Sequence, residues 1–289
     1  MRPVCYNLPM SEINKPLIIG FVADVMFTVQ IQATLEKMGY QVEWVEDASR
    51  FGQVADGPMP PGEQLRGRDG TITDYLTRQQ PALLLFDLHN QAIPWQLWIA
   101  MLKTSPATRR IPILCFGSHV DTEALKTAKA AGADEVVARS RFFSAMPELV
   151  QKHVRQVDSA GIAAACQEPA SAHAIKGLEL FNQGEYFAAH EELEHAWNDD
   201  PSPARDCYRA VLQIAVAYLQ IQRGNYNGAV KMFLRVRQWL DPLPDQCRGI
   251  NLAQLKTDVK VVEDRLQTLG HEHIQSFDQT LFRPVTYAE

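Results

Sequence analysis

The chain has 289 residues, a length that predicts two domains. Its formal net charge is −6, and most of the imbalance lies in the second half. Residues 1–160 carry 16 Lys and Arg against 17 Asp and Glu, whereas residues 161–289 carry 12 against 17. A chain without a basic stripe lacks the charges that neutralise phosphate groups, which argues against nucleic acid and anionic membranes as partners.

Five cysteines are spread along the chain without a Cys-x-x-Cys pair: Cys5, Cys115, Cys166, Cys207 and Cys247. This odd number and wide spacing predict free thiols in a reducing compartment, and they fit neither a disulfide framework nor a zinc knuckle. The first ten residues lack the apolar core of a signal peptide. No apolar run approaches the roughly 18 residues of a membrane helix. We therefore expect a cytoplasmic protein.

Short apolar runs alternate with helical patterns through the first half of the chain. The predicted strands are Pro16–Val22, Gln41–Glu46, Ala82–Phe86, Ile111–Phe116 and Glu135–Val137. The predicted helices are Val25–Met38, Trp95–Lys103, Asp121–Ala131 and Phe142–Val157. Strands that alternate with helices in this way predict an α/β domain with a doubly wound parallel sheet of five strands. We place this domain at residues 15–157, after an N-terminal extension at 1–14.

Residues 47–74 interrupt the alternation. They include Gly57–Gly62 and Arg66–Gly70, in which proline and glycine break regular elements. The stretch is roughly 20 residues longer than a typical connection in such sheets. We therefore predict a loop insertion, and not a phosphate-binding loop, because no Gly-Lys-Ser/Thr follows the glycines.

The order and lengths of these elements, with Ala131-Gly132-Ala133 before the last strand, resemble the receiver domain of response regulators. The resemblance implies a flavodoxin-like sheet and a phosphoacceptor aspartate at the end of the third strand, a position that Asp87 matches. It also implies a Mg²⁺ ion when the receiver is active, held by two acidic residues after the first strand. Here the aligned positions are Val22 and Ala23, and only Asp24, one step later, is acidic.

Two further positions depart from the receiver pattern. The family's threonine or serine falls on Gly117, with Ser118 adjacent, and the family's lysine falls on Arg139. Arginine keeps the charge but not the compact ammonium geometry, and missing carboxylates weaken Mg²⁺ binding. Because phosphoryl transfer relies on positioning and charge neutralisation, we interpret the domain as a degenerate pseudo-receiver without a cofactor. A receiver that is switched by phosphorylation of Asp87 is the alternative.

The second half of the chain is predicted to be helical. Residues 158–171 are small, polar and interrupted by proline, which predicts an interdomain linker. A helical domain follows at residues 172–270, and the tail at 271–289 has no regular pattern. The predicted helices are His173–Gln183, Glu185–Trp197, Ala204–Arg223, Tyr226–Leu240 and Leu252–Leu269. The third is apolar around most of its circumference, so we expect it at the centre of a small bundle.

A glycine, tyrosine and alanine frame occurs twice, at Gly184-x-Tyr186-x-x-Ala189 and at Gly224-x-Tyr226-x-x-Ala229. The frames resemble half of a tetratricopeptide unit, in which glycine permits the turn and alanine permits close approach of the helices. Two copies are too few for a solenoid, so a TPR-like bundle fits better. Four segments, in order, resemble the family catalogued as domain of unknown function 309: Phe181–Trp197, Leu212–Tyr218, Arg223–Ala229 and Gly249–Leu255. That resemblance implies an all-α bundle, and it does not imply any particular activity.

The first frame is followed by a cluster of ionisable side chains: His190, Glu191, Glu194 and His195. His190 and Glu194 are four residues apart and share one face of the predicted helix. We expect them to form a hydrogen-bonded polar pair in the core, with Gln213 or Arg223 of the central helix as partners.

A metal-dependent or hydrolytic site at His190, Glu191 and Glu194 is the alternative. The string is not His-Glu-x-x-His, because position 194 is a glutamate. Bundle cores do hold Glu-x-x-His metal sites, but these take matching carboxylates from other helices. The central helix offers only Asp206, near its start, so we expect no metal here.

A receiver-like domain without its activating residues, joined to a bundle without a catalytic constellation, predicts a non-enzymatic regulatory or adaptor protein. The two domains would each recognise a protein partner, and the setting that the receiver resemblance implies is signal transduction. The identity of the partner and the oligomeric state stay open at this point, and a homo-oligomer is compatible with the sequence.

Overall fold

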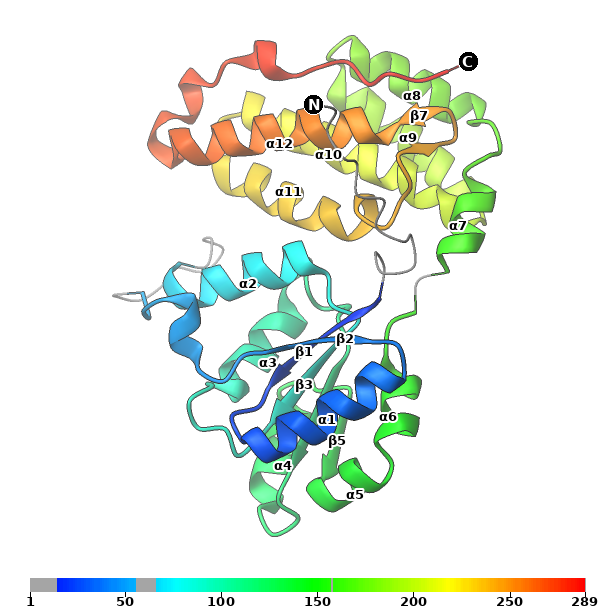
Figure 1. Ribbon diagram of the computed structural model, residues 1–289. Helices are drawn as coiled ribbons and strands as arrows, with labels where there is room; N and C mark the ends of the chain where they lie inside the picture. Colours follow the sequence, from blue (N-terminus) through cyan, green and yellow to red (C-terminus); the bar gives the residue numbers. More distant parts are fainter. Residues whose placement is uncertain (1–14, 56–65, 157, 289) are drawn as a thin grey trace, which may run out of the picture. The chain divides into compact units, whose positions relative to one another are not determined.

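The computed structural model describes residues 15–55, 66–156 and 158–288 (Figure 1). The chain divides into two compact units, of which the first contains residues 15–55 and 66–156 and the second contains residues 158–288. The predicted extension at 1–14 and the middle of the predicted insertion lie outside the described residues.

The first unit is built on a parallel sheet of five strands. These are β1 (Leu17–Phe21), β2 (Gln41–Trp44), β3 (Leu83–Asp87), β4 (Ile113–Gly117) and β5 (Glu135–Ala138). They lie in the order β2-β1-β3-β4-β5, and every neighbouring pair is parallel. This is the strand order of the flavodoxin-like doubly wound fold, so the predicted α/β fold class is confirmed.

In residues 15–55 and 66–156, six α-helices accompany the sheet: α1 (Val25–Lys37), α2 (Gly67–Gln79), α3 (Trp95–Thr104), α4 (Thr122–Ala130), α5 (Arg139–Ser144) and α6 (Met146–His153). A short 3-10 helix, η1 (Ala48–Phe51), follows β2. The closing helix that we predicted as one element is divided at Ala145, because Pro147 is tolerated in the first turn of α6 but would break the interior of one continuous helix.

Alternate strand residues enter two hydrophobic cores, one on each face of the sheet. Ile19 and Phe86 belong to the core that α2, α3 and α4 complete. Ile18 and Leu85 belong to the core that α1, α5 and α6 complete. Strands β1, β3 and β4 are therefore apolar on both faces, which explains why their sequences are continuous apolar runs.

Helix α2 lies partly inside the stretch that we predicted as a loop at 47–74, and that prediction is wrong from Gly67 onward. Glycines obscured the helical pattern, but Ile72 and Leu76, four residues apart, are fully buried against the sheet. Gly67 has φ 58°, and a Cβ atom there would lie 2.7 Å from the backbone nitrogen of Ala55. Tertiary packing therefore overrides a weak local helix propensity.

The second unit is a helical bundle, as predicted. Its α-helices are α7 (Ser159–Ala165), α8 (Ala172–Asn182), α9 (Tyr186–Asp199), α10 (Asp206–Gln222), α11 (Tyr226–Leu240) and α12 (Leu252–Leu269). Helix α10 packs against α9 and α11 and is buried along most of its length, as expected of the central helix. The helical hairpins turn at Gly184 (φ 81°) and Gly224 (φ 71°), where a left-handed backbone favours glycine.

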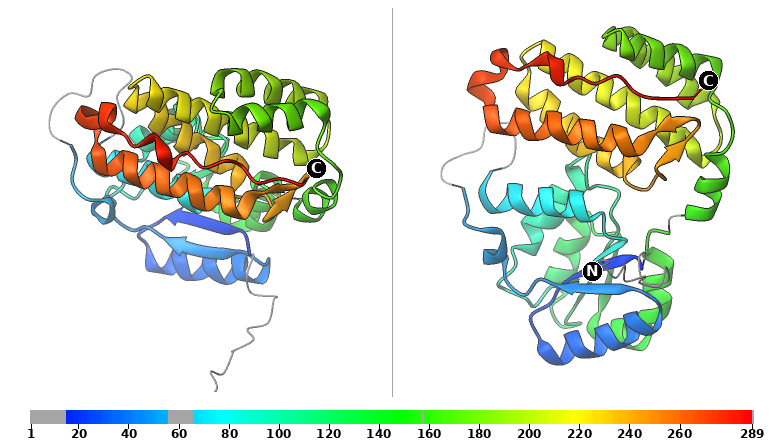
Figure 2. Two further views of the ribbon diagram at one scale, coloured as in Figure 1. Left: turned by 90° about the horizontal axis from the view of Figure 1, so that it is seen from above. Right: turned by 45° about the horizontal axis from the view of Figure 1, so that its top comes forward.

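Two segments that we predicted outside the bundle belong to the second unit. The predicted linker, residues 158–171, contains α7. The tail from residue 271 contains two 3-10 turns, η3 (His271–Ser276) and η4 (Gln279–Leu281), and runs back alongside α12 (red in Figure 2). Among the described residues, no helix is both long and apolar enough to cross a bilayer.

The cysteine prediction is wrong for one pair. Cys166 and Cys247 form a disulfide, and both are almost completely buried. Cys115 and Cys207 are free and buried, while Cys5 lies outside the described residues. The paired cysteines are 81 residues apart, so their proximity depends on the tertiary fold and leaves no local signal in the sequence.

Candidate functional site

Asp87 and Arg139 meet at the edge of the sheet where the parallel strands end. Asp87 is the last residue of β3, and Arg139 follows β5 as the first residue of α5. Nη2 of Arg139 donates to Oδ1 of Asp87 at 3.2 Å, and the backbone nitrogen of His89 donates to the same oxygen at 3.0 Å. The Asp87 side chain is 5% exposed, so salt screens this ion pair less than an exposed one.

An aromatic ring also lies close to the guanidinium. Cζ of Arg139 lies 4.7 Å from the centroid of the Phe27 ring of α1. Phe27 in turn packs against Phe143 of α5, with 5.1 Å between the ring centroids. A planar guanidinium can stack on a ring and donate in its own plane, which a lysine ammonium cannot do equally well. Arginine at this position therefore fixes a cation against Asp87.

The other two residues of the predicted receiver pocket bind their own local backbone. Asp24 is exposed and caps α1, where its Oδ1 accepts from the backbone nitrogens of Met26 at 2.9 Å and Phe27 at 3.3 Å. Oγ of Ser118 accepts from the backbone nitrogen of Val120 at 3.3 Å. The structure thus brings Arg139 to Asp87, whereas the polar contacts of Asp24 and Ser118 are local.

This set of donors does not fit Mg²⁺. The ion takes an octahedral shell of oxygen ligands and is usually anchored by one or two carboxylates. Asp87 is already paired with a cation, and the carboxylate of Asp24 is engaged by helix amides. Val22 and Ala23, which stand where the receiver family has its acidic pair, supply no side-chain oxygen.

The structure does not gather the predicted polar site of the helical half. His190 is half-buried, whereas Glu191 and Glu194 are exposed, so the polar pair that we expected in the core is not formed there. Gln213 is buried within α10. Arg223 is exposed at the end of α10, ten residues and therefore about 15 Å further along the helix axis.

Glu191 and Glu194 instead line a groove between α8 and α9. The groove has a volume of about 540 Å³ and is lined by Lys176, Leu180, Ala188, Glu191, Glu192, Glu194 and His195. Within it, Glu192 accepts from Nζ of Lys176 at 2.5 Å and contacts Nδ1 of His173 at 2.7 Å. These hydrogen bonds, first that of Lys176 and then that of His173, lower the pKa of Glu192 to about 2.

The hairpin of α8 and α9 concentrates negative charge. Residues 173–199 contain six Asp and Glu and a single Lys or Arg. Phe187 is 58% exposed on α9, one helical turn before Glu191. Nowhere in the described parts of the chain do three His, Cys, Asp or Glu side chains gather in a way that holds a metal ion. The groove therefore combines carboxylates with apolar surface, without a metal centre.

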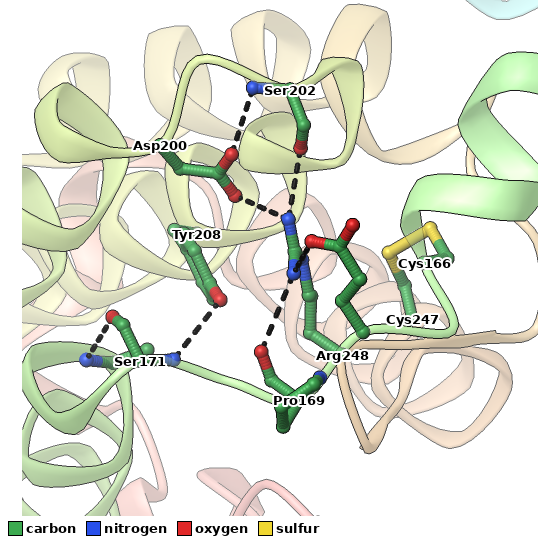
Figure 3. A network of polar contacts seen from close by, with 10 residues as sticks. Cys166, Pro169, Ser171, Asp200, Ser202, Tyr208, Cys247 and Arg248 are labelled. Carbon is green, nitrogen blue, oxygen red and sulfur yellow. Dashed lines mark hydrogen bonds and ion pairs between the residues drawn. A yellow bond between two sulfur atoms is a disulfide. The ribbon is translucent and has the colours of Figure 1, made fainter.

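A third polar cluster, centred on Arg248, was not predicted from the sequence (Figure 3). Arg248 is 5% exposed. Its Nη1 donates to Oε2 of Glu168 at 2.8 Å and to the carbonyl oxygen of Pro169 at 3.4 Å. Its Nη2 donates to Oδ2 of Asp200 at 2.8 Å and to Oγ of Ser202 at 2.9 Å. The guanidinium thus joins the loop before α8 to the loop after α9.

The surroundings of Arg248 are structural. Its backbone nitrogen donates to the carbonyl oxygen of Cys166 at 2.8 Å, beside the disulfide. The hydroxyl of Tyr208 accepts from the backbone nitrogen of Ser171 at 3.4 Å, and burial raises the pKa of Tyr208 to about 12. The partners of the Arg248 guanidinium are 46 to 80 residues away in sequence, and none of them forms a recognisable motif with it.

Residues 174–232 match the model of a protein family described as domain of unknown function (DUF309). This match confirms the resemblance that we predicted for the helical half. An uncharacterized protein of Aquifex aeolicus (strain VF5) is 28% identical to the chain over 86 residues, which make up 28% of this chain and 25% of that protein. The chain therefore spans about a quarter of the length of this curated relative.

Solved structures similar to the chain include receiver domains and response regulators. One is the receiver domain of the sensor histidine kinase PA1611 from Pseudomonas aeruginosa PAO1, with a coordinated magnesium ion. It is 15% identical to the chain, and the match covers 48% of this chain and 98% of that domain, with a TM-score of 0.37. The chemotaxis response regulator CheY4 of Vibrio cholerae is 14% identical, with coverages of 48% and 98% and a TM-score of 0.36. The fold of the first unit is itself given by its strand order.

Proposed function

We propose that this protein is a non-enzymatic regulatory adaptor in signalling, in which a pseudo-receiver and a helical bundle each bind protein partners. The observation that carries the proposal is the pairing of Asp87 with Arg139. Phosphoryl transfer depends on a positioned nucleophile and on cations that neutralise the incoming phosphate. Here the nucleophile is buried and paired, and Val22 and Ala23 supply no side-chain oxygen for a metal.

A phosphoryl group on Asp87 would have to share its site with a guanidinium that contacts both Oδ1 of the carboxylate and the ring of Phe27. In the unmodified protein, Arg139 already balances the charge of Asp87. Phosphorylation would add negative charge and disturb this balance. The first unit in this proposal keeps one conformation and presents a constant surface to its partner.

Acetyl phosphate with millimolar Mg²⁺ is expected to leave Asp87 unmodified, because the carboxylate is paired with Arg139 and the aligned Val22 and Ala23 carry no carboxylate for the metal. Intact-protein mass spectrometry and a phosphate-affinity gel measure the modification. The Asp87→Asn variant is the matched control and should give the same spectrum as the wild type. A phosphoryl adduct on the wild type that is lost in Asp87→Asn would contradict the proposal and support the switched response regulator.

The groove of α8 and α9 supports the recognition role of the second unit. Protein surfaces that bind partners combine an apolar anchor with charges that select the partner and speed its approach. Leu180 and Ala188 supply apolar surface in the groove, Phe187 is exposed on the same helix as Ala188, and Glu191 and Glu194 supply exposed carboxylates. Charge complementarity favours a cationic partner surface.

The double variant Glu191→Lys, Glu194→Lys is expected to lose its partner in affinity purification from the native cell, because it reverses the charge of the groove. Quantitative mass spectrometry compares the recovered proteins with those of the wild type. Glu272→Lys, at an exposed position in η3, is the control with a charge reversal elsewhere in the same unit. Equal recovery of every cationic partner by the double variant would rule out the groove as the recognition surface.

A further inference from the structure

The C-terminal tail is bound to the second unit in the manner of a peptide ligand. After η4, residues 282–288 run in an extended conformation alongside α12 (Figure 2). Three separate devices hold this segment: an aromatic slot, an amide clamp and a short strand pairing. The side chains of Arg283 and Pro284, between the slot and the clamp, are exposed.

The aromatic slot receives Phe282. Its ring stacks on Tyr218 of α10, with 4.2 Å between centroids and 10° between planes, and it meets Tyr186 of α9 edge-on at 5.8 Å. Tyr218 is fully buried, and within the described residues its hydroxyl finds no hydrogen-bond partner. Offset-stacked and edge-to-face contacts are the geometries that aromatic pairs prefer, so the slot selects an aromatic side chain.

The amide clamp is Asn182, the last residue of α8. Its Oδ1 accepts from the backbone nitrogen of Val285 at 2.7 Å, and its Nδ2 donates to the carbonyl oxygen of Val285 at 3.0 Å. One side chain thus satisfies both backbone groups of one residue. Such a contact recognises the backbone of an extended segment and does not depend on its side chain. Val285 is 4% exposed, and this burial selects an apolar residue.

The last device is the edge of β7 (Ile250–Asn251). Ile250 and Tyr287 form an antiparallel bridge. The backbone nitrogen of Asn251 donates to the carbonyl oxygen of Thr286 at 2.9 Å, and that of Ala288 donates to the carbonyl oxygen of Gly249 at 2.9 Å. Addition of a strand to an exposed edge is a common mode of peptide recognition.

We propose that the slot, the clamp and the strand edge form a binding site for an extended Phe-x-x-Val segment of a protein partner, and that the tail occupies it in cis. The proposal rests on the recognition role proposed above for the helical unit. The tail shows which chemistry fits: an aromatic residue against Tyr186 and Tyr218, and an apolar residue three positions later at Asn182. A partner segment with these residues displaces the tail.

The experiment uses the full chain and a fluorescent peptide with the sequence of residues 277–288. In the double variant Phe282→Ala, Val285→Ala the resident tail is weakened, and we expect the peptide to bind at least about tenfold more tightly than to the wild type, because less of the site is occupied in cis. Adding Asn182→Ala should remove about tenfold or more of that affinity. Arg283→Ala, which changes an exposed tail residue, should bind the peptide as the wild type does.

Absence of saturable peptide binding to a folded double variant, with folding checked by circular dichroism, overturns the proposal. If that variant does not fold, hydrogen exchange on the wild type decides. The amides of Val285 and Ala288 should exchange through an opening that leaves α10 protected. Exchange of these amides only together with α10 would make the tail an integral part of the bundle and overturn the site. Neither readout depends on the α8–α9 groove, so failure here leaves the function proposed above untouched.

Discussion

Replacement of Arg248 by alanine is expected to lower the free energy of unfolding of the helical unit by about 3–5 kcal/mol, the cost of removing one partner from a buried ion pair. The Asp200 side chain is 12% exposed, and without the guanidinium it keeps only the backbone nitrogen of Ser202 as a donor at 2.8 Å. Glu168 is 66% exposed and contributes little, because water solvates it in either case. Native-state hydrogen exchange of the α10 amides measures the loss.

Two further variants separate charge from geometry at this position. Arg248→Lys keeps the charge but not the planar fork that reaches Glu168 and Asp200 at once, so an intermediate loss is expected. Asp200→Asn in the Arg248→Ala background should recover part of the stability, because it removes the unpaired buried charge. A loss below about 1 kcal/mol in Arg248→Ala would show that the network is no stronger than a surface ion pair.

Under oxidising conditions, the free energy of unfolding of the Cys166→Ser variant is expected to be about 2–4 kcal/mol lower than that of the wild type. The disulfide closes a long loop, since the cysteines are 81 residues apart, and thereby restricts the unfolded chain. Denaturant titrations with and without dithiothreitol measure the effect. In the presence of the reductant the wild type should converge on the variant.

Cys115→Ser is the matched control, because it changes a free buried cysteine of the other unit. It should leave the helical unit as sensitive to the reductant as in the wild type. A wild type whose helical unit is equally stable in both redox states would exclude a stabilising disulfide. Mass spectrometry of peptides from unreduced protein checks the pairing directly.

The sheet could be predicted because its central strands are buried on both faces and therefore appear as uninterrupted apolar runs. Helix α2 could not, since Gly67 and Gly70 hide a pattern that is stabilised by contacts of Ile72 and Leu76 with the sheet. The local sequence indicates only the local helix propensity, whereas long-range contacts with the sheet determine that α2 is helical.

The polar residues of the second unit illustrate the same limit. His190, Glu191 and Glu194 are close in sequence, yet His190 is half-buried whereas Glu191 and Glu194 are exposed and line a groove. Arg248 and Asn182 make polar contacts with partners that lie up to 103 residues away in sequence. Only the fold brings these groups together.

The position of the disulfide has a consequence for proteolysis. Residues 174–232, which match the DUF309 family, lie entirely between Cys166 and Cys247. Cys166 and Cys247 are joined by the disulfide, and their Cα atoms are 4.3 Å apart. A single cut in the loop between α9 and α10 would thus leave two fragments linked through sulfur. The nicked chain would run as one band on a non-reducing gel and as two bands after reduction.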